Sequence, residues 1–184
     1  NAMSFKNIFK IILITIFFLV IFTVYNISNI AKADTNNENK FIHEAKYWKR
    51  LGSNVQCLLC PFKCLIKEGK RGNCNVRMNM SGRLVTLVYG RTCARHIDPI
   101  EKKPVFHLLP GSKAYSIATP GCNLGCKFCQ NWQISQTLPE KIDTEYFSPE
   151  DVVNDAIKNK CESIAYTYTE PTIFYEYVLE TAKL

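Results

Sequence analysis

The chain has 184 residues, which is enough for one ordinary domain and a small additional module. Its formal net charge is +7, but no run of lysine and arginine is interleaved with aromatic residues, which argues against nucleic-acid binding. Nine cysteines at short spacings fit poorly with a closed set of disulfides and favour metal binding instead.

The N-terminal segment is strongly apolar. Asn1-Ala2 before Met3 is typical of an expression-tag remnant, and residues 11–31 carry no charge, which is just enough for a membrane span. The segment ends in Ala31-Lys32-Ala33, a pattern that a signal peptidase could cut. We therefore interpret residues 1–33 as a tag residue followed by a signal peptide or membrane anchor.

Residues 34–41 are polar and predict a linker, and residues 42–112 predict a cysteine-rich module. Within this module, residues 42–51 have apolar side chains at helical spacing before Gly52, which predicts a helix. Residues 84–89 have the alternating, β-branched pattern of a strand.

From residue 113 onward the pattern is that of an α/β fold. Residues 114–118 predict a buried strand, and Ser148-Pro-Glu-Asp151 is a capping box that begins a helix reaching about residue 160. Residues 163–168 predict a second strand, and a second helix begins at Pro171. A strand–helix–strand–helix order implies a parallel sheet.

Three cysteines directly follow the first of these strands. Cys122, Cys126 and Cys129 have the spacing C-x3-C-x2-C. Three thiolates can hold three corners of a [4Fe–4S] cluster and leave the fourth iron open to another ligand. The alternative is a zinc knuckle or three buried thiols, but zinc usually takes four protein ligands and no histidine lies nearby.

This motif, with Phe128 before its last cysteine, is similar to that of radical S-adenosylmethionine (SAM) enzymes. The segment Thr169-Glu170-Pro171 resembles that family's Gly-Gly-Glu-Pro segment, with Tyr168 and Thr169 in place of the two glycines. The resemblance implies that the cluster reductively cleaves SAM to a 5′-deoxyadenosyl radical, with Phe128 and Glu170 as cofactor-binding residues. It also implies a partial (βα)6 barrel, of which residues 113–184 hold the first two βα units.

A narrower resemblance extends over roughly residues 44–184. Segments within residues 91–136 are similar to the AmmeMemoRadiSam-system radical SAM enzymes, which are relatives of pyruvate formate-lyase activating enzymes. This implies a low-potential electron donor and an unknown protein or small-molecule substrate. Memo-like and AMMECR-like proteins are partner candidates. No catalytic residue is implied. With two of six βα units, we expect these 184 residues alone to be inactive.

An earlier cysteine group also matches the N-terminal region of that family, at the spacing C-x2-C-x3-C-x9-C. It consists of Cys57, Cys60, Cys64 and Cys74. Four thiolates at this spacing suit either a second Fe–S cluster or a structural Zn²⁺, and the spacing does not distinguish them. Cys93 and Cys161 are interpreted as small core residues. Lys102 and Lys103 are expected in a solvated loop, with a substrate carboxylate or phosphate as the alternative contact.

Two other functions fit parts of the pattern. One is a glycyl-radical-enzyme activase, and the other is a non-catalytic zinc or Fe–S protein that binds a partner or transfers electrons. Because SAM and low-potential electron donors are cytosolic, we expect a membrane-associated protein with its catalytic part in the cytosol. Export after signal cleavage is the alternative.

Overall fold

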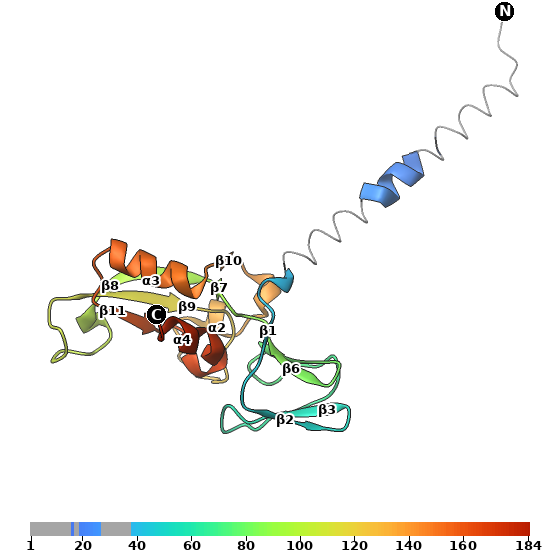
Figure 1. Cartoon of the computed structure of the whole chain (residues 1–184), viewed down its shortest axis with the longest axis horizontal. Helices are drawn as coiled ribbons and strands as arrows, with labels where there is room; N and C mark the ends of the chain where they lie inside the picture. Colours follow the sequence, from blue (N-terminus) through green and yellow to red (C-terminus); the bar gives the residue numbers. More distant parts are fainter. Residues whose placement is uncertain (1–15, 17–18, 27–37) are drawn as a thin grey trace, which may run out of the picture. The chain divides into compact units, whose positions relative to one another are not determined.

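The computed structural model describes residues 16, 19–26 and 38–184 (Figure 1). The chain divides into two compact units, Asn1–Asn39 and Lys40–Leu184. In the first unit, residues 16 and 19–26 are helical, and the rest of the apolar segment at 11–31 lies outside the described residues, as does the cleavage pattern at 31–33. Among the described residues, none of the helices has both the length and the apolar character needed to span a bilayer.

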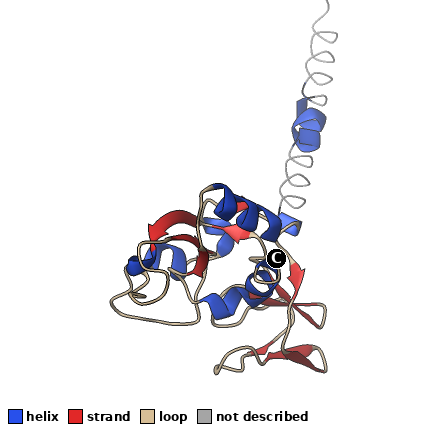
Figure 2. Cartoon of the chain, turned by 60° about the vertical axis from the view of Figure 1, so that its left-hand side comes forward, coloured by secondary structure: helices blue, strands red, loops and turns tan. Residues whose placement is uncertain are grey.

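The second unit is a mixed α/β structure, in which Figure 2 distinguishes helices from strands. Its strands are β1 (His43–Glu44), β2 (Trp48–Leu51), β3 (Asn54–Cys57), β4 (Leu65–Ile66), β5 (Arg77–Met80), β6 (Arg83–Thr86), β7 (Arg91–Thr92), β8 (Ala94–Pro99), β9 (Lys113–Ala118), β10 (Glu145–Tyr146) and β11 (Ser163–Tyr166). Its helices are η1 (Ile100–Lys102), α2 (Trp132–Ser135), η2 (Pro139–Lys141), α3 (Pro149–Lys158), η3 (Pro171–Phe174) and α4 (Tyr175–Thr181).

Two small antiparallel sheets make up the cysteine-rich part. They have the strand orders β1-β6-β5 and β2-β3-β4. Their shared core contains Val55, Ile66 and Leu84, each at most 1% exposed, together with the buried Cys57. Burial of such a small apolar set stabilises a small sheet only modestly. A further source of stability is therefore expected in this part of the chain.

The helix predicted over residues 42–51 is wrong. This stretch forms β1 and β2 instead, and β2 pairs with β3 in a hairpin whose register places Leu51 opposite Asn54. Gly52 has a φ of +65°, so it forms the tight turn of the hairpin and does not end a helix. In a stretch of ten residues, the apolar pattern does not distinguish the helical period of about 3.6 residues from the strand period of two. The pairing with β3 therefore determines that the stretch forms strands.

The strands and the helix predicted after residue 113 are confirmed. β9 pairs in parallel with β11, so that Tyr115 lies opposite Ile164 and Ile117 opposite Tyr166. Between them, α3 begins with the predicted capping box, in which Ser148 accepts from the Asp151 N–H at 3.1 Å and Asp151 accepts in return at 2.9 Å. From Pro171 the chain continues as η3 and then α4.

Two features of the larger sheet differ from the expectation. Its order is β11-β9-β8, and β8, where the sequence predicted no strand, runs antiparallel to β9 over six residue pairs. The strand predicted at 84–89 is shorter, because β6 ends at Thr86. The main core joins the two halves of the unit, which are the cysteine-rich part before residue 113 and the α/β part that follows it. In this core, Val76 and Val88 pack with Ile117 of β9. Residues 40–184 are therefore one packed body around a shared core.

Candidate metal and cofactor site

The three motif cysteines lie on the loop that follows β9. Cys122, Cys126 and Cys129 line one hollow of about 860 Å³, and the segment after β11, including Tyr168 and Glu170, lines the same hollow. Because β9 and β11 are parallel, their carboxyl ends meet at one edge of the sheet and bring these two loops together. The topology therefore places the sequence-predicted cysteines and the predicted carboxylate around one space.

The thiols differ in exposure and partners. Cys126 is exposed, whereas Cys122 and Cys129 are half-buried. The Cys122 Sγ accepts the Leu124 N–H at 3.4 Å, and the Cys129 Sγ lies 3.4 Å from the Ser135 Oγ. Across the described residues, no group of three or more His, Cys, Asp or Glu side chains has the geometry to hold a metal ion as it stands.

The donor set and the space nevertheless fit the expected group. Three thiols on one loop supply the ligand type that Fe–S clusters take. The volume of the hollow lies in the range of sites that hold small cofactors, roughly 300–1,000 Å³. A four-iron cluster needs thiols set apart around a cage, in contrast to a single zinc, which gathers its sulfurs around one point.

The two predicted cofactor-binding residues have different surroundings. Glu170 lies on the wall of the hollow, and its Oε1 accepts the Thr172 hydroxyl at 2.6 Å and the Thr172 N–H at 3.4 Å. These contacts fix the carboxylate at the start of η3. Phe128 is 88% exposed and is not part of that wall.

Tyr168 is held by a network that the sequence did not reveal. It has a φ of +68°, a left-handed conformation that glycine adopts freely and tyrosine does not. Its hydroxyl donates to Asp98 Oδ2 at 2.7 Å, and its carbonyl accepts from Asn131 Nδ2 at 3.1 Å. Since Asn131 follows the cysteine loop, this network ties that loop to the segment carrying Glu170.

Asp98 is the centre of this network. It is buried and accepts hydrogen bonds from Ser116 on β9 and from Lys102 and Lys103 at 2.8 and 2.6 Å. Burial alone would raise the pKa of Asp98, but the bonds donated by these groups and by Tyr168 outweigh it and hold the pKa well below its usual range. Both lysines line the hollow and pair with Asp98, and the side chain of Lys102 is 59% exposed, as expected for a solvated residue, whereas that of Lys103 is 12% exposed. In the sequence, the only sign of these ion pairs is that Lys102 and Lys103 follow Asp98 by four and five positions.

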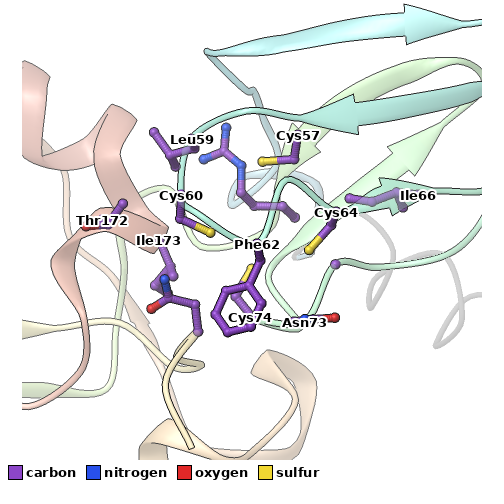
Figure 3. A pocket seen from close by; sticks show the side chains of 13 residues that line it. Cys57, Leu59, Cys60, Phe62, Cys64, Ile66, Asn73, Cys74, Thr172 and Ile173 are labelled. Atoms are coloured by element: carbon purple, nitrogen blue, oxygen red, sulfur yellow. The ribbon is translucent and has the colours of Figure 1, made fainter.

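The earlier cysteine group forms a second, smaller cavity of about 20 Å³ (Figure 3). Its four thiols are Cys57, Cys60, Cys64 and Cys74, and all nine cysteines of the chain are free. Burial raises the pKa of the Cys57 and Cys74 thiols. The other two cysteines, Cys93 and Cys161, are half-buried and belong to neither cavity, and burial raises the pKa of Cys93 to about 12.

Comparison with known proteins gives one family match and one relative. Residues 116–184 match the family model of the Radical SAM superfamily, which includes all three motif cysteines and Glu170. The chain is also 46% identical over 142 residues to an uncharacterized protein of Methanocaldococcus jannaschii, a match that covers 77% of this chain and 43% of that protein. The chain thus spans less than half the length of this relative. No solved structure matches the chain. The family match supports the radical SAM superfamily for the C-terminal part of the chain.

Proposed function

We propose that this chain is the N-terminal part of a radical SAM enzyme, in which Cys122, Cys126 and Cys129 hold a [4Fe–4S] cluster. The observation that carries the proposal is the hollow shared by these three thiols and Glu170 at the carboxyl ends of β9 and β11. The family match over residues 116–184 supports it independently. When bound, the cluster supplies one electron for the reductive cleavage of SAM.

The other residues of the hollow have roles in binding and orientation. Glu170 offers a carboxylate to the ammonium group of SAM, and its two bonds from Thr172 fix its direction. Tyr168 presents the backbone that precedes Glu170, and Asn131 holds that backbone against the cysteine loop. A low-potential electron donor is required as a partner, and the substrate is a protein or small molecule that meets the hollow.

The proposal is tested by reconstituting the chain with iron and sulfide without oxygen and adding SAM. We expect a reduced cluster whose EPR signal changes when SAM is added, because SAM binds the iron that lacks a protein ligand. This readout reports binding and does not depend on turnover.

Two variants make the test specific. Cys126→Ala should lose most of the cluster and the response to SAM, while Cys161→Ala, which removes a thiol outside the hollow, should keep both. A Cys126→Ala protein that retains the full cluster and its SAM response would show that the ligands are assigned wrongly.

A further inference from the structure

We propose that Cys57, Cys60, Cys64 and Cys74 bind a single zinc-class divalent ion in tetrahedral thiolate coordination, and that this ion braces the loop carrying Cys122. The site is separate from the hollow of the motif cysteines and does not rest on the proposed reaction. It would supply the additional stability that the small core of the cysteine-rich part lacks.

The four thiols come from three neighbouring segments. Cys57 ends β3, Cys60 and Cys64 lie on the turn between β3 and β4, and Cys74 precedes β5. Figure 3 shows their sulfur atoms directed into one space. Gly72 lies against this space, because a Cβ added there would lie 3.6 Å from the Cys64 Sγ and 3.3 Å from Ile66. The backbone is thus packed tightly around the thiols.

The size of the cavity decides which metal group it suits. At about 20 Å³ it is little larger than the space that one water molecule needs, roughly 10–15 Å³ on the same measure. Such a space accommodates one ion. A cage of four irons and four sulfides needs far more room. The structure therefore favours a single ion over a second Fe–S cluster at this position.

Arg77 gives an independent indication that the cavity holds an anionic centre. Its side chain is 2% exposed and lines the cavity, and its two terminal nitrogens bind Glu176 and the Lys46 carbonyl. Its Nε is buried without a hydrogen-bond partner. One divalent ion with four thiolates carries a net charge of about −2, and a thiolate sulfur can accept this N–H.

Backbone N–H groups lie near two of the sulfurs, that of Leu59 near Cys57 and those of Val76 and Arg77 near Cys74. Donors beside a sulfur favour its thiolate form, as the outer contacts of metal ligands do. Because no closed shell is present among the described residues, we expect the ion to draw the sulfurs in through rotation about χ1, which leaves the backbone in place.

The ion would also hold the motif loop. Gly121 directly precedes Cys122, and a Cβ added there would lie 2.7 Å from the Cys74 carbonyl and 2.4 Å from Val76. Asn123, on the other side of Cys122, lines the small cavity, and so does Thr172, which binds Glu170. Fixing Cys74 therefore fixes the wall against which the start of the motif loop packs.

The test measures metal in the full chain carrying Cys122→Ala, Cys126→Ala and Cys129→Ala together, purified without oxygen. We expect roughly one zinc per chain and no iron or sulfide, because four protein thiolates close a zinc site. Adding Cys60→Ser and Cys64→Ser should abolish the zinc. The matched control is Cys93→Ser with Cys161→Ser, which should leave it unchanged.

Cobalt gives a readout that does not depend on how the serine variants fold. The triple variant, stripped of metal and titrated with Co²⁺ alone, should develop the intense visible bands of tetrahedral thiolate coordination. In the wild-type chain, removal of zinc by a chelator should speed hydrogen exchange at residues 121–126. The single-ion site would be overturned by iron and sulfide in the triple variant, by a cobalt spectrum without thiolate bands, or by a protein mass showing that the four cysteines form disulfides. Unchanged hydrogen exchange at residues 121–126 would overturn the bracing of the motif loop.

Discussion

Tyr168 occupies a position where the resembling segment of radical SAM enzymes carries glycine, and its surroundings explain how a tyrosine is accommodated. A left-handed tyrosine costs of order 1–3 kcal/mol and persists only where neighbours determine the conformation. Here Asp98 binds its hydroxyl and Asn131 binds its carbonyl. The side chain that causes the strain thus also supplies a contact that offsets it.

The depressed pKa of Asp98 gives a prediction at this scale. Because its folded-state pKa lies below the unfolded value of about 3.9, its contribution to stability is complete above that value and is lost as the pH falls toward the folded-state pKa. Asp98→Asn should lower the free energy of unfolding at pH 7 by about 2–3 kcal/mol, since it weakens bonds to a charged group.

Urea unfolding of both proteins across the pH range measures this effect. The difference between wild type and Asp98→Asn should stay constant from pH 7 to about pH 5 and shrink below it. Other carboxylates titrate in both proteins and cancel in the difference. A difference that persists unchanged into the acid range would mean that Asp98 acts through its shape and not through its charge.

At the scale of elements, local signals were sufficient for some parts and insufficient for others. The capping box at Ser148 and the β-branched run at 163–166 are encoded within a few residues, so α3 and β11 were predictable. By contrast, β2 exists because Trp48 pairs with Cys57, and β8 because His96 pairs with Ser116. Such pairings depend on partners that a local pattern does not contain.

The candidate site divides in the same way. The hollow containing Cys122, Cys126 and Glu170 follows from the spacing of the motif and from the rule that parallel strands end at one edge. The bond between Asp98 and Tyr168 joins residues 70 positions apart, and no local signal announces it. The small volume of the second cavity, which favours a single ion over a cluster, likewise depends on packing around Gly72 and Arg77 and could not be predicted from the sequence.

The N-cap of α3 carries the prediction at this scale. Ser148→Ala removes the oxygen that accepts the Asp151 N–H, and it should lower the free energy of unfolding by about 1 kcal/mol. Ser148→Asn keeps a capping oxygen and should retain most of the stability. Urea midpoints of the three proteins measure both effects, and equal losses in the two variants would argue against a capping role.

At the scale of the whole molecule, one buried ion pair joins the cysteine-rich part to the C-terminal helix. Arg77 on β5 contacts Glu176 on α4 at 2.9 and 3.0 Å, with side-chain exposures of 2% and 0%. Glu176 also accepts the Lys46 N–H at 2.6 Å. These contacts link segments from both halves of Lys40–Leu184 and predict that the unit unfolds as one.

Removing one partner of this pair tests the prediction. Glu176→Gln removes the carboxylate charge that pairs with both terminal nitrogens of the buried Arg77 guanidinium, so it should lower the free energy of unfolding by about 3–5 kcal/mol. The matched control is Glu44→Gln, which breaks the ion pair with Arg83, whose side chains are 58% and 64% exposed. That change should cost less than about 1 kcal/mol, because exposed pairs gain little over hydration.

Two probes follow unfolding in urea, the fluorescence of the tryptophans and the far-ultraviolet circular dichroism of the helices. Both should report one transition at the same midpoint in wild type and at one lower midpoint in Glu176→Gln, since the main core is shared by both halves. Separate midpoints in the wild-type protein would contradict the single unit. A loss no larger than that of Glu44→Gln would mean that water reaches Arg77 once Glu176 is neutral, and that the buried pair does not hold the two halves together.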